Sequence, residues 1–308
     1  MPEETVPAGA TPTRCGFVAV IGATNAGKST LVNRLVGTKV SIVSRKVQTT
    51  RSMVRGIVMH GRSQIIFVDT PGFFRPKRRL DRAMVDTAWT GAKDADLVAF
   101  LVDAQRGFDE ENRDLLAKLA AVPHPKVLVL NKVDAVAREN LLALAAEANA
   151  AVKFEGTFMI SALTGDGVDD LLAFLAGAVP EGPWLYPEDE VSDLPLRNLS
   201  AEITREKIFD RLHQELPYAI TVETEKWTDQ PDGSVRIEQT IYVERDGQKK
   251  IVIGKGGETI KGISMAARKE ISALAECPVH LFLFVKVREN WGDDPERYRE
   301  MGIEFPKD

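Results

Sequence analysis

The sequence predicts an α/β domain with a mixed, mostly parallel sheet, followed by a smaller α+β domain. In the first half of the chain, short runs of β-branched and apolar residues alternate with longer helical stretches. Such alternation indicates a parallel sheet covered by helices on both faces. A proline-rich segment at residues 180–187 interrupts it, and the expected order then changes to α-β-β-α-α-β. A length of 308 residues is long for a single core and suits two domains.

The elements of the first domain follow in chain order. A strand is expected at residues 17–21 and a helix at 28–35. Strands at 55–60 and 63–68 flank the tight turn Gly61-Arg62, so this pair is expected to be antiparallel. Further strands, each followed by a helical pattern, are expected at residues 97–102, 126–130 and 157–160. Sheets of this kind bind ligands outside the carboxyl ends of their strands, so the site is expected at that edge.

The second half begins with a predicted linker. Residues 180–187 contain three prolines and a glycine, and an acidic run follows them. A helix capped by Ser200 is expected to extend to residue 216. The elements expected after it are strands at 218–227 and 234–243, helical stretches to about residue 276, and a strand at 279–287. The predicted parts are a flexible tail at 1–14, the first domain at 15–180, the linker at 181–199 and the second domain at 200–308.

Composition narrows the class of protein. The formal net charge of −5 excludes a uniformly basic nucleic-acid coat protein, although a local basic site remains compatible with it. Cys15 and Cys277 have no metal-like neighbours and are expected to be reduced thiols. No apolar run reaches the roughly 18 residues of a membrane span, and the polar start does not resemble a signal peptide. A cytosolic protein is therefore expected.

A phosphate-binding turn is predicted at residues 22–29, where GATNAGKS fits the pattern G-x-x-x-x-G-K-[ST] between a strand and a helix. The glycines allow backbone N–H groups to surround the α- and β-phosphates at a helix N-terminus, which favours anions. Lys28 is placed for the β- and γ-phosphates and Ser29 for Mg²⁺. Nucleotide contacts are expected from Gly22, Ala23, Thr24, Asn25, Ala26, Gly27, Lys28, Ser29 and Thr30.

A second motif, DTPG at residues 69–72, follows a predicted strand. Asp69 is expected to hold Mg²⁺ through water, and the Gly72 amide to contact the γ-phosphate. The intervening residues 41–51 are rich in hydroxyls, as suits a segment that orders around the γ-phosphate. One threonine there is expected to complete the Mg²⁺ shell, with Thr50 favoured over Thr49. The predicted metal ligands are Ser29, Thr50 and Asp69; the predicted catalytic residues are Lys28, Thr50, Asp69 and Gly72; Thr70 and Pro71 are further expected nucleotide contacts.

The motif NKVD at residues 131–134 indicates which nucleotide base the site binds. The Asp134 carboxylate can accept hydrogens from guanine N1 and its 2-amino group, whereas adenine would leave a buried carboxylate unpaired. Asn131 is expected to brace the loop, and the Lys132 stem to cover the ring. After the next strand, Ser161, Ala162 and Leu163 are expected to supply a backbone N–H to guanine O6. The sequence therefore predicts GTP and GDP, with Mg²⁺, rather than ATP.

Together these motifs resemble the TrmE–Era–EngA group of P-loop GTPases, and nearly the whole chain is similar to the Era family within it. The resemblance is carried by QTTR at 48–51, DTPG at 69–72, NKVD at 131–134, ELPY at 215–218 and the stretch 244–254. It implies a Ras-like GTPase domain followed by a KH domain, in an enzyme that hydrolyses GTP to GDP and phosphate. It also implies binding to the 3′ end of small-subunit ribosomal RNA and a role in 30S assembly. A cytoplasmic monomer is expected, with no DNA partner and at most peripheral contact with the inner face of the cell membrane.

Two residues bear on the mechanism of hydrolysis. Phe73 follows Gly72, where Ras has a water-orienting glutamine. A phenyl ring cannot orient water, so slow intrinsic hydrolysis is expected. Some relatives use the residue equivalent to Asn25 to help hold K⁺ beside the phosphates, although Thr24 stands where they often have proline. K⁺ is expected to accelerate turnover relative to Na⁺, and a purely structural Asn25 is the alternative.

The second domain contains GKGG at residues 254–257, which resembles the GXXG clamp of a KH domain. Glycines let backbone amides approach a sugar-phosphate strand closely, and Lys255 adds charge. Residues 245–269 contain seven basic and two acidic residues, a net charge of +5 that suits single-stranded RNA. The order of elements suggests the type II KH arrangement. RNA contacts are expected from Lys250, Ile253, Gly254, Lys255, Gly256, Gly257 and Lys261.

Three other functions are compatible with parts of this sequence. A tRNA-modification GTPase of the same group is disfavoured because those proteins carry extra domains and a C-terminal Cys motif that this sequence lacks. A metabolic kinase is disfavoured because residues 131–134 serve base recognition. An RNA-binding assembly factor with a purely structural nucleotide stays open at this point.

Overall fold

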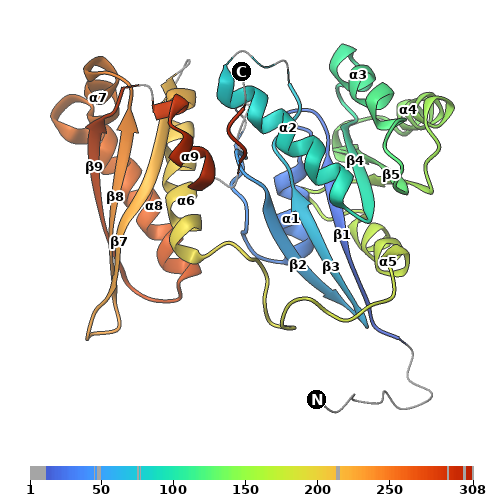
Figure 1. Ribbon diagram of the computed structural model, residues 1–308, viewed down its shortest axis with the longest axis horizontal. Helices are drawn as coiled ribbons and strands as arrows, with labels where there is room; N and C mark the ends of the chain where they lie inside the picture. The colour runs from blue at the N-terminus through green and yellow to red at the C-terminus, as the bar shows by residue number, and fades with distance from the viewer. Residues whose placement is uncertain are drawn as a thin grey trace.

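Two β-sheets, one of six strands and one of three, organise the described part of the chain (Figure 1). The computed structural model describes residues 12–44, 46, 50–74, 76, 78–212, 216–289, 291–300 and 303–306. Most of the predicted tail (residues 1–11), together with Gln48, Thr49 and Glu215 of the sequence motifs, lies outside the described residues. Arg14, assigned to the tail from sequence, is instead the first residue of a strand.

The six-stranded sheet has the order β2-β3-β1-β4-β5-β6. β2 and β3 are antiparallel and the other pairs are parallel, which confirms the predicted mixed sheet. The elements in chain order are β1 Arg14–Ile21, α1 Lys28–Val36, β2 Val54–His60, β3 Ser63–Asp69, α2 Arg79–Asp94, β4 Leu97–Asp103, α3 Glu110–Leu119, β5 Lys126–Asn131, α4 Arg138–Ala151, β6 Gly156–Ile160 and α5 Val168–Ala178.

Alternation along the strands builds a core on each face of this sheet. Val18 and Val20 of β1 lie in the cluster that includes residues of α1 and α5. Ala19 and Ile21 lie in the opposite cluster, with residues of α2, α3 and α4. Burial on both faces explains why the central strands are continuously apolar.

Strand register brings the functional motifs to one edge. The pairing of β1 with β3 sets Val20 beside Asp69, and the pairing of β4 with β5 sets Asp103 beside Asn131. Because these strands are parallel, their carboxyl ends lie at the same edge, where the sequence placed the site.

The three-stranded sheet has the order β7-β8-β9, with β7 antiparallel to β8 and β8 parallel to β9. Its elements are α6 Leu196–Arg211, β7 Ile220–Asp229, β8 Val235–Val243, α7 Asp246–Ile253, α8 Glu258–Leu274, β9 Val279–Val287 and α9 Pro295–Glu300. The order α-β-β-α-α-β is as predicted, and the short α9 was not predicted. No helix in the described part of the chain is long and apolar enough to cross a bilayer.

The predicted start of α6 was wrong. The helix begins at Leu196 with Pro195 as N-cap, four residues before the expected cap Ser200. The Ser200 hydroxyl is buried, donates to the Arg197 carbonyl and accepts from Gln239 Nε2 at 3.1 Å. A serine can therefore be used inside a helix when a neighbouring strand supplies a partner.

The predicted linker packs against the first sheet. The Gln64 side chain accepts a hydrogen bond from the Leu185 N–H at 2.8 Å and donates one to the Tyr186 carbonyl at 2.8 Å. Farther on, the Ile57 N–H of β2 donates to the Val191 carbonyl at 2.9 Å. The segment thus follows the edge strand β2, although it forms no long regular element.

Candidate functional site

Residues 22–27 form a turn between β1 and α1 that only glycine allows at two points. Gly27, the N-cap of α1, has φ 100°, and a Cβ there would lie 2.3 Å from Asn131 Nδ2. A Cβ on Gly22 would lie 2.2 Å from the Leu101 carbonyl oxygen. The backbone is therefore tightly packed beneath the turn, and the N–H groups at the start of α1, which have no intrahelical partner, can donate to phosphate oxygens.

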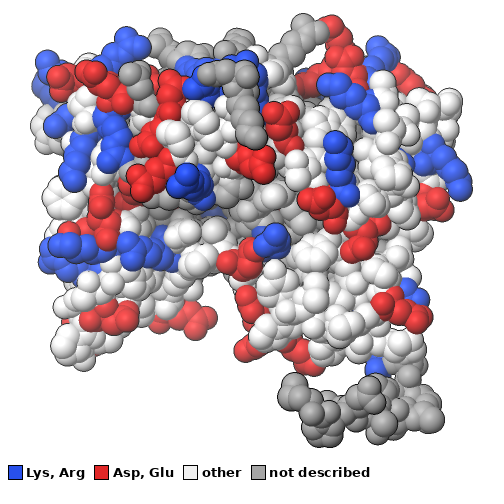
Figure 2. Space-filling model, viewed as in Figure 1, with Lys and Arg blue, Asp and Glu red and all other residues white. Residues whose placement is uncertain are grey.

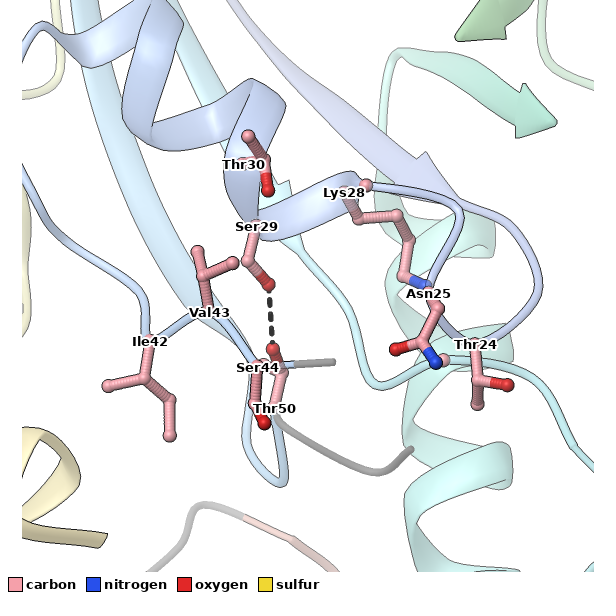
Figure 3. Close-up of a pocket in the computed structure, with 11 residues that line it drawn as sticks. Thr24, Asn25, Lys28, Ser29, Thr30, Ile42, Val43, Ser44 and Thr50 are labelled. Carbon is pink, nitrogen blue, oxygen red and sulfur yellow. Dashed lines mark hydrogen bonds between the residues drawn. The ribbon is translucent and has the colours of Figure 1, made fainter. Parts of the chain in front are cut away.

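Lys28 is buried at the base of this turn. Its Nζ donates to the carbonyls of Gly22 at 3.1 Å and Ala23 at 2.9 Å. Burial lowers the pKa of Lys28 to about 8, and the nearby carboxylate of Asp69 opposes that shift. Figure 3 shows the side chain extending along the turn toward Asn25. A bound phosphate would place a negative charge next to this buried ammonium and so offset the cost of its desolvation.

Two hydroxyls and a carboxylate meet beside Lys28. Ser29 Oγ donates to Asp69 Oδ2 at 2.7 Å, and Thr50 Oγ1 lies 2.9 Å from Ser29 Oγ (Figure 3) and 3.3 Å from Asp69 Oδ2. Burial raises the pKa of Asp69, and hydrogen bonds from Ser41, Ser29 and Thr50 oppose the shift. Asp69 Oδ1 is buried and has no hydrogen-bond partner among the described residues. Mg²⁺ prefers such oxygen donors, so these residues fit the ion.

Ser41 belongs to this cluster, although it was not among the predicted site residues. It is buried, and its hydroxyl donates to Asp69 Oδ2 at 2.7 Å. The sequence signal was only that residues 41–51 are rich in hydroxyls, which does not single out one of them. Ile42, Val43 and Ser44 were also missed as lining residues. The pocket is lined by Thr24, Asn25, Gly27, Lys28, Ser29, Thr30, Ile42, Val43, Ser44, Thr50 and Gly72.

The DTPG residues divide between the pocket and the core. Gly72 adjoins the phosphate turn, because a Cβ there would lie 3.2 Å from Lys28 Nζ and 2.9 Å from Thr24 Cγ2. Thr70 was expected to contact nucleotide, but its hydroxyl is buried and donates to the Val20 carbonyl at 2.9 Å. Pro71 is also buried. Neither residue lines the pocket.

Phe73 packs in the core and does not line the phosphate pocket. It is 3% exposed, and its ring centroid lies 4.6 Å from that of Trp89 on α2. Its backbone forms an isolated bridge with the phosphate turn, since the Phe73 N–H donates to Gly22 and its carbonyl accepts from Thr24. This packing agrees with the expectation that no side chain at this position orients water.

Asn131 connects the phosphate turn with the base loop. Its Nδ2 donates to the Ala26 carbonyl at 2.8 Å, and its Oδ1 accepts from the Ala162 N–H at 2.9 Å. Lys132 adopts φ 67° and forms a 2.6 Å ion pair with Asp103, a contact that the sequence did not predict. Asp134 is exposed. The Ala162 amide, one of three expected to offer an N–H to guanine O6, is engaged by Asn131.

Ser161, Ala162 and Leu163 follow β6 and lie on one loop. Ser161 and Ala162 are buried, whereas Leu163 is exposed. Arg34 of α1 donates to the Ala162 carbonyl at 3.3 Å and also to that of Leu163. The loop is thus held against the helix that carries Lys28.

The GKGG residues lie between α7 and α8, at an exposed bend. Gly254 has φ 76° and ψ 173°, a conformation essentially restricted to glycine, and a Cβ there would lie 2.2 Å from Thr259 Oγ1. Gly256 and Gly257 also have positive φ, but a Cβ on either meets no described atom within 4 Å. Lys255 at the tip is exposed, so the loop offers open backbone next to a positive charge.

Basic side chains surround this loop. Lys250 and Lys261 are exposed, and Ile253 is half-buried at the end of α7. Figure 2 shows Lys and Arg side chains gathered around the position of α7, with acidic side chains beside them. The local excess of positive charge fits a polyanionic strand.

Two family models match the chain. One, described as a 50S ribosome-binding GTPase, matches residues 17–132, and one described as a KH domain matches residues 215–292. GTPase Era from Rhizobium meliloti strain 1021 is 71% identical over 300 residues, which cover 97% of this chain and 96% of the relative. The chain belongs to the Era family of GTPases. As an Era GTPase, it hydrolyses GTP to GDP and phosphate.

Two solved Era structures resemble this Era GTPase along most of its length. Era in complex with MgGDPNP and nucleotides 1506–1542 of 16S ribosomal RNA has a TM-score of 0.88 and 37% identity, covering 94% of this chain and 99% of the other. An Aquifex aeolicus Era variant bound to GDP and AlF4⁻ has a TM-score of 0.89 at the same identity and coverage. These likenesses confirm the predicted Ras-like and KH domains of this Era chain.

Proposed function

We propose that this chain is a GTP-dependent switch that binds the 3′ end of small-subunit ribosomal RNA and assists assembly of the 30S subunit. The observation that carries the proposal is the presence of a GTPase site and a KH loop in one chain. Support comes from its similarity, over 94% of its length, to an Era structure that contains MgGDPNP and 16S ribosomal RNA.

The phosphates are assigned to the turn before α1. Residues 22–30 surround them, the backbone N–H groups at the start of α1 donate to them, and Lys28 exchanges its carbonyl contacts for phosphate oxygens. Ser29, Thr50 and Asp69 would hold Mg²⁺, Asp69 through water, and the bound ion would neutralise charge on the transferring phosphate. Gly72 adjoins Lys28 and the phosphate turn, and its amide is assigned to the γ-phosphate.

The guanine is assigned to the loops after β5 and β6. Asp134 is exposed and free to accept from guanine N1 and the 2-amino group. Asn131 fixes both loops to the phosphate turn, and the Lys132 stem covers the ring. Of the backbone N–H groups of residues 161–163, those of Ser161 and Ala162 donate to Asp166 and Asn131, so the Leu163 N–H is assigned to O6. A base without the 2-amino group would leave the Asp134 carboxylate short of a donor, which gives the preference for guanine.

Hydrolysis proceeds without a glutamine after Gly72, because Phe73 is buried against Trp89. Catalysis is then left to Lys28, Mg²⁺ and backbone donors, and intrinsic turnover is slow. We propose that K⁺ beside Asn25, which lines the phosphate pocket, adds positive charge. The test compares phosphate release in K⁺ and Na⁺ for the parent protein and Asn25→Ala; equal rates in both salts would remove this role.

RNA is assigned to the loop between α7 and α8, through Lys250, Ile253, Gly254, Lys255, Gly256, Gly257 and Lys261. The backbone there is open and the three lysines are exposed. Because the proposed partner is the 30S subunit, we place the protein in the cytoplasm as a monomer, with at most peripheral contact with the inner face of the membrane. The proposal assigns it no DNA partner.

The experiment measures fluorescence anisotropy of a single-stranded RNA matching the small-subunit 3′ end. It uses protein loaded with GDPNP or GDP, and the double variant Lys255→Asp/Gly256→Asp. Asp tolerates the left-handed φ of residue 256, so the variant changes charge with little strain. Lys153→Asp, on the first domain and 87% exposed, is the matched control.

Tighter binding with GDPNP, lost in the double variant and kept in the control, supports a nucleotide-gated switch that uses the GXXG loop. Equal binding in both nucleotide states would contradict the switch. Equal binding by the double variant would contradict the assignment of RNA to this loop.

A further inference from the structure

The residues that flank Thr50 are attached to the KH domain at several points. Lys39 forms a 2.7 Å ion pair with Glu206 of α6, and the Val43 N–H donates to the same carboxylate at 2.8 Å. Lys46 Nζ donates to two carbonyls at the end of α6, those of Phe209 and Leu212. The segment that contains Lys39, Val43 and Lys46 is therefore bound to α6.

Arg51 makes the contact nearest to the Mg²⁺ ligands. The residue is 5% exposed, and its guanidinium donates to the carbonyls of Ile220 at 2.8 Å and Tyr218 at 3.1 Å. It also lies 5.5 Å from the ring centroid of Trp291, whose Nε1 donates to Ala219 at 3.0 Å. Burial lowers the pKa of Arg51 to about 9, so it stays cationic at neutral pH. A rigid fork that spans two carbonyls and stacks on a ring is a use specific to arginine.

Helix α2, which follows the DTPG motif in the chain, packs against the same part of the KH domain. Leu80 and Met84 of α2, the helix after Gly72, pack in one apolar cluster with Trp291, Tyr298 and Ile303. Trp291 thus contacts both Arg51 and the helix that follows the γ-phosphate contact. The KH domain therefore contacts both the segment that carries Thr50 and the helix that follows the DTPG motif.

We propose that Arg51 is a positioning residue, which holds Thr50 at the Mg²⁺ site by anchoring the chain directly after it to the KH domain. The inference rests on the proposed role of Thr50 as a Mg²⁺ ligand. Thr50 Oγ1 lies 2.9 Å from Ser29 Oγ, and the planar peptide that follows it leads into the buried Arg51. Displacement of Arg51 from β7 would therefore displace the Thr50 hydroxyl.

The coupling works in both directions. If docking of the KH domain improves Mg²⁺–GTP binding, then Mg²⁺–GTP improves docking by the same factor. GDP binding depends mainly on the phosphate turn and the base loops, which Arg51 does not touch. The inference thus predicts an effect confined to the triphosphate state.

The test uses the full chain and measures affinity for fluorescent GDPNP and GDP across a Mg²⁺ titration. The variants are Arg51→Met, Arg51→Lys, Thr50→Val and the double variant Arg51→Met/Thr50→Val. Arg55→Met is the matched control, since Arg55 also contacts a residue outside the first domain, Asp193, at 2.7 Å. Thermal unfolding identifies any variant that fails to fold. If Arg51→Met does not fold, the same affinities are measured on the conservative variant Arg51→Lys instead.

Arg51→Met is expected to weaken GDPNP binding at limiting Mg²⁺ by about 10- to 100-fold, as residues supporting metal ligands commonly do, with GDP binding unchanged. Arg51→Lys should recover part of the loss, and the control should match the parent protein. In the Thr50→Val background, Arg51→Met should have no further effect on the Mg²⁺ dependence.

Two outcomes overturn the inference, and they differ from failure of the proposed function. If Thr50→Val changes the Mg²⁺ dependence but Arg51→Met and Arg51→Lys do not, Arg51 does not position Thr50. An additive effect of the two substitutions would likewise show that Arg51 acts independently of Thr50. If Thr50→Val itself leaves the Mg²⁺ dependence unchanged, the assignment of Thr50 to the metal fails first.

Discussion

Replacement of Asn131 by alanine should weaken nucleotide binding without altering any group that touches phosphate. The side chain is 2% exposed and makes two buried hydrogen bonds, to the Ala26 carbonyl at 2.8 Å and from the Ala162 N–H at 2.9 Å. Leaving a buried polar group without its partner costs about 1–3 kcal/mol. Both groups belong to loops that form the site, so a loss of at least about 2 kcal/mol is expected, which corresponds to roughly 30-fold weaker binding.

The assay is equilibrium binding of fluorescent GDP and GDPNP. The loss should be equal for the two nucleotides, because neither hydrogen bond lies at the γ-phosphate. Asn112→Ala is a matched control: Asn112 is 1% exposed and donates to the Gly107 carbonyl at 2.7 Å, in the connection between β4 and α3, and it bonds to neither Ala26 nor Ala162. It should lower the free energy of unfolding but not nucleotide affinity. Unchanged GDP affinity in Asn131→Ala would refute the reasoning and show that the two loops hold their positions independently.

Three further outcomes are expected. Gly254→Ala should abolish RNA binding in the anisotropy assay, because its Cβ would lie 2.2 Å from a hydroxyl; Gly256→Ala should cost only the strain of φ 61°, about 1–2 kcal/mol. Burial acts to raise the pKa of Glu270, but hydrogen bonds from two lysines hold it below its usual 4.5. That contribution to stability is present above pH 4.5 and is lost as pH falls through the lowered pKa, so urea unfolding should show a steeper acid loss in the parent protein than in Glu270→Gln. Phe73→Gln should not accelerate phosphate release, since the new amide would be buried, and should destabilise the protein by about 1–3 kcal/mol.

The parts of the fold that sequence could predict are those with a local signal. A strand followed by GATNAGKS places Lys28 and Ser29 at the start of a helix, because turn glycines and helix N-termini depend on neighbours in the chain. β9, at Val279–Val287, has the predicted bounds, since Pro278 precedes its apolar alternation and the charged residues Arg288 and Glu289 follow it. Fold class and element order follow from such periodicities.

Contacts between distant residues carry no such signal. Ser41 meets Asp69 across 28 positions, and Arg51 meets Ile220 across 169. A hydroxyl-rich stretch predicts that some group contacts the metal site, but only packing decides which one. The wrong cap at Ser200 has the same origin, because Gln239 on another strand provides its partner.

The segment after residue 180 affects how the first domain would behave as an isolated fragment. β2 is an edge strand, and an uncovered edge presents unpaired N–H and C=O groups that recruit strands from other molecules. Here Ile57 bonds to Val191, and Tyr186 packs with Ile57 and Ile66 on the sheet. A chain that ended at Pro180 would uncover that edge and should self-associate, whereas one that continued to Asp193 would keep its own cover. The connection between the two domains therefore also protects the first domain from aggregation.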